Sequence, residues 1–267
     1  MADDTTRDTG SGPVAVVTGA TSGIGRAVAD ELGRAGARLF LCARGGDALQ
    51  VTLKELRAQG VTADGTVCDV RSPEESAAFV RGAVARYGAI DVLVNNAGRN
   101  GGGSTAELTD ELWNDVIETN LNSVFRITRQ VLKEGGMLSR GAGRIINIAS
   151  TGGKQGVALA APYSASKHGV VGFSKALGLE LAKTGVTVNA VCPGYVETPM
   201  AERVRQGYAA HWGTTTEDVQ QRFEAKIPLG RYTAPQEVAS LVAYLTTPAA
   251  APITAQAINV CGGLGNY

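Results

Sequence analysis

Residues 14–25 read VAVVTGATSGIG, a short apolar run that leads into a turn rich in glycine. The run is largely β-branched, which is typical of a buried strand, and an amphipathic stretch over 24–35 follows it. Gly19, Gly23 and Gly25 permit a tight turn and a close approach of the backbone to a phosphate, which a helix N-terminus attracts. Their spacing departs from the usual G-x-G-x-x-G pattern, so a glycine turn without a ligand stays open as an alternative.

The alternation of apolar runs with helical patterns continues along the chain. Strands are predicted over 14–18, 38–43, 61–69, 90–95, 144–150, 186–192 and 257–261, and helices over 24–35, 47–59, 73–87, 110–134, 163–183 and 235–246. This alternation indicates a parallel sheet with helices on both faces, which binds ligands at the carboxyl ends of its strands. We expect a disordered tail over 1–12 and a single α/β domain over 13–267, a Rossmann fold with a doubly wound parallel sheet of seven strands.

Composition and charge argue against several classes of partner. Of the 267 residues, 25 are Lys or Arg and 25 are Asp or Glu, so the charge balance gives no reason to expect nucleic acid or a membrane. The chain has no run of about 18 apolar residues and no signal pattern at its start, which favours a cytoplasmic protein. Cys42, Cys68, Cys192 and Cys261 form no CxxC pair, so we expect buried reduced thiols and no metal site.

One stretch, 200–227, lies outside the alternation. It holds aromatic residues, among them Tyr208 and Trp212, and a histidine, His211, that we expect to line a pocket. Thr214 and Glu217 have the spacing of a capping box that would start a second helix. We expect a helical flap over the strand ends, and a plain surface excursion is the alternative.

Arg44 follows the second predicted strand, where an NAD site would carry a carboxylate for a ribose hydroxyl. A guanidinium instead matches a 2′-phosphate in charge and geometry, which favours NADPH over NADH. The alternative is a solvated arginine at the end of a strand. Asp69 ends the third predicted strand and is placed to accept a hydrogen bond from the adenine amino group.

Tyr163 and Lys167 lie on one face of the helix that follows the fifth predicted strand. A phenol is a poor acid–base group at neutral pH because its pKa is near 10. An ammonium about 4 Å away would favour the phenolate by roughly 4 kcal/mol, or about three pKa units, and desolvation would take some of this back. Ser150 ends the fifth predicted strand on the same rim, where its hydroxyl can hold a carbonyl oxygen.

These residues occur in order with TGATSGIG (18–25), NNAG (95–98), ETNL (118–121), YSASK (163–167) and CPGYVETPM (192–200). Together they resemble the short-chain dehydrogenase/reductase family over about residues 13–263. The resemblance implies that Tyr163 donates a proton to a carbonyl that Ser150 positions, and that Lys167 binds the nicotinamide ribose and lowers the pKa of the tyrosine. It also implies that Asn120 kinks its helix and holds a water in a proton relay.

The resemblance further implies an NADPH site along the strand ends. In it Asn96 stabilises the sheet and Gly98 leaves room for the adenosine ribose. The expected cofactor-binding residues are Thr18, Gly19, Ser22, Gly23, Ile24, Gly25, Arg44, Gly45, Asp69, Val70, Asn96, Ala97, Gly98, Tyr163 and Lys167, with Pro193, Gly194, Val196 and Thr198 lining the nicotinamide.

A narrower resemblance, to the aromatic polyketide ketoreductases, rests on RNGGG (99–103), STGGKQGV (150–157), AAPYSASKHGVVGF (160–173) and NVCGGLGNY (259–267). Cys261 stands where the wider family usually has Asp, and it fits this group. The group is tetrameric and uses NADPH to reduce one ketone, the C9 carbonyl, of a poly-β-ketone on an acyl carrier protein. The substrate contacts implied are Arg99, Asn100, Gly101, Gly102, Thr151, Gly152, Gln155, Val157, Met200, Tyr208 and Trp212.

Carrier proteins of this kind are acidic, and Arg44, Arg71 and Arg99 all follow strand ends, so we expect the carrier to dock near them, with ordinary solvated arginines as the alternative. Asn100 replaces a proline that the group carries, which leaves the stereochemistry of the product open. Two other functions also stay open at this stage. One is a 3-oxoacyl carrier-protein reductase of fatty-acid synthesis, and the other is a regulator that senses NADP without catalysis.

Overall fold

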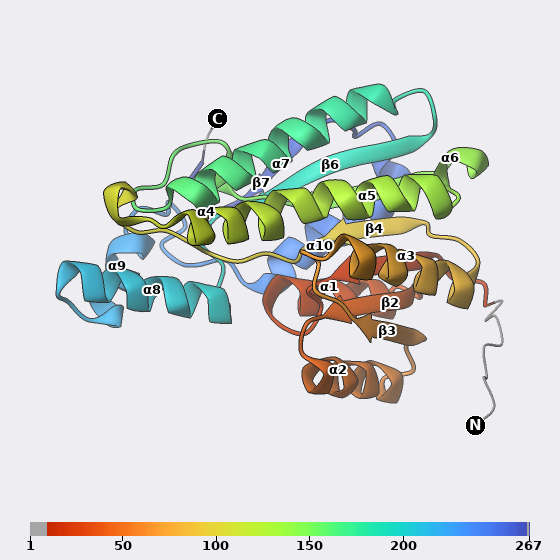
Figure 1. Ribbon diagram of the computed structural model, residues 1–267, viewed down its shortest axis with the longest axis horizontal. Coiled ribbons are helices and arrows are strands. Elements are labelled where there is room, and N and C mark those ends of the chain that lie inside the picture. Colours follow the sequence, from red (N-terminus) through yellow and green to blue (C-terminus); the bar gives the residue numbers. More distant parts are fainter. Residues whose placement is uncertain (1–9, 266) are drawn as a thin grey trace.

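The computed structural model describes residues 10–265 and 267. Within them, seven strands form one parallel sheet in the order β3-β2-β1-β4-β5-β6-β7 (Figure 1). The strands are β1 Val14–Thr18, β2 Arg38–Ala43, β3 Ala63–Val67, β4 Val92–Asn95, β5 Gly143–Ile148, β6 Val186–Pro193 and β7 Ala257–Val260. The strand order reverses between β1 and β4, and this switch point is where open α/β sheets bind ligands. The predicted doubly wound Rossmann fold is confirmed.

Helices cover both faces of the sheet (Figure 1). The helices are α1 Gly23–Arg34, α2 Gly46–Ala58, α3 Pro73–Tyr87, α4 Asp110–Ile117, α5 Ser123–Glu134, α6 Met137–Arg140, α7 Ala161–Glu180, α8 Pro199–Trp212, α9 Thr216–Glu224 and α10 Pro235–Thr246. Side chains of α1, α2 and α10 pack into one apolar core, and those of α3, α5 and α7 pack into the core on the opposite face.

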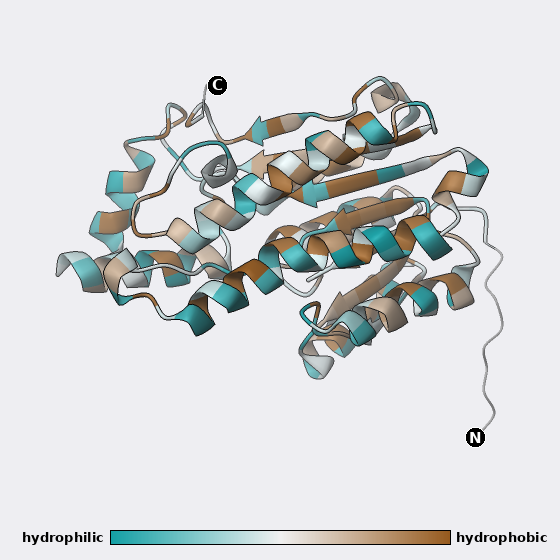
Figure 2. Ribbon diagram, turned by 45° about the horizontal axis from the view of Figure 1, so that its top comes forward, coloured by the Kyte–Doolittle hydropathy of each residue, from teal (hydrophilic) through white to brown (hydrophobic). Residues whose placement is uncertain are grey.

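Strand β1 supplies both cores because its side chains alternate between the faces of the sheet. Ala15 and Val17 belong to the core beneath α1 and α10, whereas Val14 and Val16 belong to the core beneath α3 and α5. Figure 2 shows the resulting pattern, with mostly apolar strands enclosed by helices that are apolar on one side and polar on the other. Burial on both faces explains why the apolar runs are nearly continuous rather than alternating.

The end of β4 is locked to the glycine turn that follows β1. The Nδ2 of Asn96 donates hydrogen bonds of 3.0 Å to the carbonyl oxygens of Thr18 and Gly19. The hydroxyl of Thr18 in turn accepts from the backbone N–H groups of Asn96 and Ala97, at 3.0 and 2.9 Å. A Cβ on Gly25 would lie 2.3 Å from this same Nδ2, so only glycine fits beneath the asparagine. These contacts fix the shape of the sheet edge at the switch point.

The structure corrects three boundaries that the sequence suggested. The predicted helix over 110–134 is interrupted by a π-helical turn, Glu118–Asn122, which separates α4 from α5. Strand β5 ends at Ile148, so Ser150 does not end a strand but caps the 3₁₀ turn Thr151–Gly153 and accepts from the N–H of Gly152. Strand β3 is shorter than the predicted 61–69.

The predicted flap over 200–227 is helical and consists of α8 and α9, which lie at the left of Figure 1. Helix α9 starts one residue later than expected, because the side chain of Thr215 rather than Thr214 caps it by accepting from the N–H of Asp218. The tail expected over 1–12 falls largely on residues 1–9, which lie outside the described residues. None of the described helices is long and apolar enough to cross a membrane.

Candidate active site

A cavity of about 960 Å³ runs along the carboxyl ends of the strands. It extends from the glycine turn after β1 to the flap helix α8, so it crosses the switch point between β1 and β4. Almost every residue expected to bind cofactor or substrate lines it. Thr18 and Gly25 are exceptions, since both are buried behind the wall, where they hold Asn96 and the turn together.

Ser150, Tyr163 and Lys167 meet in the middle of this cavity. Tyr163 and Lys167 come from the first two turns of α7, and the Lys167 Nζ lies 5.8 Å from the centroid of the tyrosine ring. The same Nζ donates a 2.8 Å hydrogen bond to the carbonyl oxygen of Ile148, at the end of β5. Lys167 is only 6% exposed, so this ammonium is held by a backbone dipole in a poorly hydrated place.

Burial dominates the titration of this cluster. Desolvation raises the pKa of Tyr163, and a hydrogen bond from the Ser150 hydroxyl opposes the rise. Desolvation also lowers the pKa of Lys167 from 10.5 to about 8. Burial therefore holds the pKa of Tyr163 above its ordinary value, and the lowering by Lys167 that the resemblance implies stays a prediction. Tyr163 is therefore a neutral phenol at physiological pH, which is the form that can donate a proton.

Asn120 is completely buried at the π-helical turn, and it does not line the cavity. Its Oδ1 accepts from the N–H of Arg99 at 2.8 Å, and its Nδ2 donates to the Arg99 carbonyl and to the hydroxyl of Ser166. Ser166 donates in turn to the carbonyl of Tyr163. The predicted break in the helix is present, and the Asn120 side chain connects the loop after β4 to α7, the helix that carries Tyr163 and Lys167.

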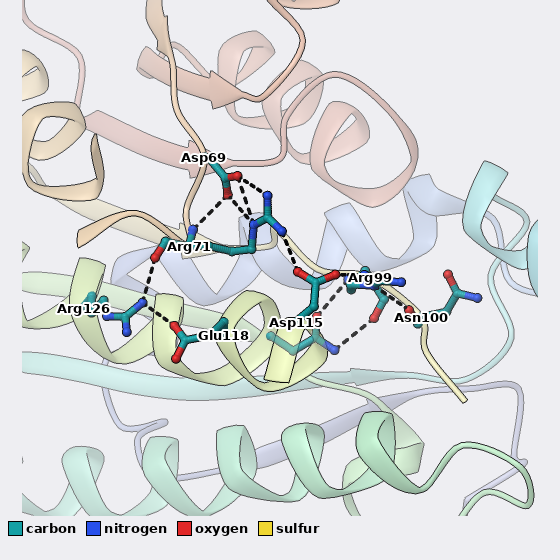
Figure 3. Close-up of polar contacts among 8 residues, drawn as sticks. Asp69, Arg71, Arg99, Asn100, Asp115, Glu118 and Arg126 are labelled. Atoms are coloured by element: carbon teal, nitrogen blue, oxygen red, sulfur yellow. Dashed lines mark hydrogen bonds and ion pairs between the residues drawn. The ribbon is translucent and has the colours of Figure 1, made fainter. Parts of the chain in front are cut away.

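The three arginines expected at the cavity mouth differ in their partners. Arg71 forms ion pairs with Asp69 and Asp115, and Arg99 forms one with the same Asp115 (Figure 3). Burial lowers the pKa of Arg99, and the nearby positive charges of Arg44 and Arg71 lower it further. Arg44 is exposed and has no ion pair with any described residue. The charges of Arg71 and Arg99 are thus largely neutralised by carboxylates, whereas the charge of Arg44 is unpaired among the described residues.

Asp69 is hydrogen-bonded to a neighbouring arginine, and its expected contact with adenine stays a prediction. Its carboxylate accepts from the Arg71 side chain and from the Arg71 N–H, and these contacts lower its pKa. The sequence placed this carboxylate opposite an adenine amino group. In the structure it binds Arg71 after the end of β3, and it also lines the cavity.

The glycines of RNGGG fit tightly against neighbouring segments. A Cβ on Gly101 would lie 2.3 Å from the side chain of Val116 in α4, and one on Gly102 would lie 1.9 Å from the carbonyl oxygen of Leu159. The N–H of Gly103 donates to that same oxygen. Glycine is required here because α4 and the loop before α7 approach the backbone closely.

Aromatic residues gather where the flap meets the cavity, and one of them, Tyr195, was not assigned from the sequence. The Tyr208 ring lies 4.9 Å from Trp212, as expected of a covering helix, and its hydroxyl donates a 2.6 Å hydrogen bond to the carbonyl of Ala158. Tyr195, which follows β6, stacks on Phe223 of α9 and also lines the cavity. Nothing in the sequence indicates the contact between Tyr195 and Phe223, because the two residues lie far apart in the chain. Tyr195 itself stands within the motif CPGYVETPM. His211 lines the cavity as predicted.

His168 and the cysteines bind no ligand-like group among the described residues. The Nδ1 of His168 lies 2.9 Å from the carbonyl oxygen of Ser164, one turn earlier in α7. All four cysteines are buried and free, as predicted. Among the described residues no group of three or more His, Cys, Asp or Glu side chains is arranged to hold a metal ion.

The sequence and the fold define the class of protein. The model of the family described as short chain dehydrogenase matches residues 13–209. The chain therefore belongs to the short-chain dehydrogenase family and is an oxidoreductase.

Its relatives narrow this class. A protein of Streptomyces coelicolor described as a ketoacyl reductase is 68% identical over 95% of this chain and 97% of its own. The granaticin polyketide synthase ketoacyl reductase 1 of Streptomyces violaceoruber is 64% identical over 98% of this chain and 96% of its own. The 3-oxoacyl-[acyl-carrier-protein] reductase FabG of Escherichia coli is 38% identical over 95% and 97% of the two chains.

A solved structure agrees with these relatives. A tryptophan variant of the actinorhodin polyketide ketoreductase, determined with NADPH, superposes with a TM-score of 0.94 at 68% identity, and the match covers 96% of this chain and 98% of that one. The fold around the cavity is thus shared with a ketoreductase of known structure.

Burial of Lys167 predicts a stability that depends on pH. Its pKa is about 8 in the folded protein and 10.5 when it is unperturbed, so the unfolded chain binds more protons between these values and stability rises with pH across this window. Relative to a Lys167→Met variant, the wild type should gain roughly 3 kcal/mol between pH 8 and 10.5. Unfolding free energies of both proteins at several pH values measure this gain.

The exposed Lys183→Met variant controls for the loss of one charge. A difference between wild type and Lys167→Met that stays constant from pH 7 to 10.5 would contradict the predicted burial cost.

Proposed function

We propose that this chain is an NADPH-dependent ketoreductase that reduces one ketone, the C9 carbonyl, of a poly-β-ketone held on an acyl carrier protein. The observation that carries the proposal is the convergence of Ser150, neutral Tyr163 and buried Lys167 in a cavity closed by an aromatic flap. The names of the more similar relatives support the substrate class, because two of them belong to polyketide synthases and share 64% and 67% of their residues with this chain. The fatty-acid reductases share 38% and supply the second candidate substrate, a linear 3-oxoacyl chain.

The residues at the switch point suit a nicotinamide dinucleotide phosphate. Ser22 at the N-cap of α1 makes no side-chain cap hydrogen bond, unlike Thr198 and Thr215 at the starts of α8 and α9. The first N–H groups of α1 are therefore available to a pyrophosphate, which the helix dipole also favours. Gly19 and Gly23 have positive φ values of 65° and 54°, so the turn beside these groups requires glycine. Arg44 supplies an unpaired guanidinium for a 2′-phosphate.

The other expected cofactor-binding residues are assigned to parts of the cofactor by their position along the cavity. Gly45, Asp69 and Val70 would surround the adenine end, and Ala97 and Gly98 the ribose beside the end of β4. A Cβ on Gly98 would lie 3.7 Å from the Lys167 Nζ, so the absence of a side chain keeps the approach to this ammonium open. Ile24, Pro193, Gly194, Val196 and Thr198 line the same cavity.

Each catalytic side chain has a defined task in this proposal. The nicotinamide supplies the hydride to the carbonyl carbon. Ser150 orients the carbonyl oxygen, and Tyr163 donates its phenolic proton to that oxygen, which is possible because burial keeps the phenol neutral. The Lys167 ammonium, charged below pH about 8, stabilises the negative charge that then develops on the phenol.

Asn120 acts through position in this reaction. Both atoms of its side-chain amide are already bound, to the Arg99 backbone and to Ser166. A water of the proton relay would therefore have to bind to the backbone of Asn120, which lies in the π-helical turn. The relay would return a proton to Tyr163 by way of Lys167.

The substrate would enter between the loop after β4 and the flap. Arg99, Asn100, Thr151, Gly152, Gln155, Val157, Met200, Tyr208 and Trp212 line this part of the cavity with Gly101 and Gly102. Its aromatic faces and width suit a long or partly cyclised polyketide better than a small polar alcohol. An acidic carrier would dock near Arg44, Arg71 and Arg99. Its attraction to them would be modest, because the 2′-phosphate would pair with Arg44 while Asp69 and Asp115 pair with the other two.

The outer helices expose large apolar side chains that the homotetramer implied by the resemblance would cover. Trp113 of α4, Phe125 of α5, Leu138 of α6 and Leu179 of α7 are large apolar side chains with 43% to 73% of their surface exposed. Phe125 and Leu138 also line an apolar groove together with Leu177 of α7. We propose that copies of the chain associate through this side of the molecule, which would remove these side chains from water.

Arg44 provides a test of the cofactor. An Arg44→Ala variant should raise the KM for NADPH roughly 10- to 100-fold, because it removes a charge-assisted hydrogen bond to phosphate, and should change the KM for NADH little. Arg71→Ala removes one positive charge from the same rim and serves as a control with a change of less than about three-fold. Equal effects of Arg44→Ala on both cofactors would refute this assignment.

A comparison of two substrates tests the function itself. With NADPH, we expect kcat/KM for a fused bicyclic ketone to exceed that for an acetoacetyl thioester, because the wide aromatic mouth buries two rings better than a short linear chain. Initial rates of NADPH oxidation at 340 nm supply both values. A clear preference for the linear thioester would instead favour the reductase of fatty-acid synthesis.

A further inference from the structure

Tyr195 stands where the strand ends meet the flap. It follows Gly194 after β6, and its carbonyl accepts two hydrogen bonds of 2.9 Å, from the N–H and the hydroxyl of Thr233. Its ring is stacked on Phe223 of α9 at 4.6 Å between centroids and on Tyr232 at 5.3 Å. Backbone and ring are both fixed, so the position of the hydroxyl is set before any ligand arrives.

The phenols around the flap differ in what their hydroxyls bind. The Tyr208 hydroxyl donates to the carbonyl of Ala158, and the Tyr232 hydroxyl is hydrogen-bonded to Arg205. The Tyr195 hydroxyl has no hydrogen-bond partner among the described residues, and it is not one of their fully enclosed polar atoms. Tyr195 lines the cavity, and aromatic rings cover its face, so the accessible part of the side chain is its polar edge.

A phenol in such a place normally has a partner. Burial raises the pKa of Tyr195 to about 12, so the group is a neutral donor throughout the physiological range. The nearby phenols Tyr208 and Tyr232 add to this rise. A neutral donor beside aromatic walls fits a neutral oxygen acceptor such as a carbonyl, because a carboxylate would lose far more hydration on entry.

We infer that the Tyr195 hydroxyl donates a hydrogen bond to a second carbonyl of the substrate, one that is not reduced, and so selects substrates with more than one oxygen. The inference rests on the proposed function. In a poly-β-ketone the carbonyls stand on alternate carbons, so a neighbouring oxygen is present whichever ketone is reduced. Tyr195 is therefore a specificity-determining residue, and Tyr163 remains the proton donor.

Two substrates that differ by one oxygen test this inference. One is a fused bicyclic monoketone, and the other is the same ring system with a second carbonyl two carbons away. The readout is the ratio of kcat/KM for the diketone to kcat/KM for the monoketone, measured with NADPH. Tyr195→Phe keeps the ring and its stacking but removes the donor, and it should lower this ratio roughly 3- to 10-fold.

Tyr232→Phe is the matched control, because it removes a phenol of the same stack whose hydroxyl is bound to Arg205. It should leave the ratio within about two-fold of the wild type. The ratio does not depend on the fraction of folded enzyme, so a less stable variant cannot imitate the expected result.

The outcomes separate the inference from the function on which it rests. If the wild type reduces the monoketone and Tyr195→Phe leaves the ratio unchanged, the inference alone is overturned. The same holds if Tyr232→Phe lowers the ratio as much as Tyr195→Phe does. A wild type that reduces neither ketone overturns the proposed function together with the inference.

Discussion

The amide of Asn96 is the contact on which the geometry of this protein depends. From the end of β4 its Nδ2 reaches the carbonyl oxygens of Thr18 and Gly19, and it occupies the space that a side chain on Gly25 would need. The bond joins the two strands between which the order of the sheet reverses. The glycine turn, the start of α1 and the loop that carries Arg99 are thereby held at one switch point. The sheet pairs β1 with β4, and the Asn96 amide extends this pairing to the turn and the loop that line the cavity.

The second constraint is burial of the catalytic groups. Burial raises the pKa of Tyr163, so the phenol holds its proton, and it lowers the pKa of Lys167 to about 8, so the ammonium gives up its proton more readily than an exposed lysine does. Burying these groups lowers the folding stability, and in the proposed function it keeps the phenol in the form that can donate a proton to a carbonyl. Backbone oxygens rather than carboxylates accept from the amine, since Ile148 supplies the acceptor for Lys167. A carboxylate there would hold the proton too firmly.

The fold, and the meeting of Ser150, Tyr163 and Lys167 in one cavity, could be predicted because they depend on local sequence patterns. Continuous apolar runs revealed the strands, and the i, i+4 spacing of Tyr163 and Lys167 placed them on one face of α7. Partnerships between distant residues could not be predicted in this way. The residues around Arg71 and Arg99 in the sequence do not indicate that Asp115, which lies 44 residues from Arg71, forms ion pairs with both guanidinium groups. Burial could not be predicted either, since the spacing of Tyr163 and Lys167 shows their proximity but not the loss of water that raises the pKa of Tyr163.

The central claim is that the catalytic set acts on a carrier-bound polyketide, and product analysis tests it most directly. The protein is incubated with a minimal polyketide synthase, its acyl carrier protein, precursors and NADPH, and the products are resolved by mass spectrometry. The account predicts a product with two more hydrogen atoms than the unreduced polyketide, formed by the wild type and absent when Tyr163→Phe replaces it. An unchanged product profile from a wild-type preparation that reduces acetoacetyl thioester would contradict the account.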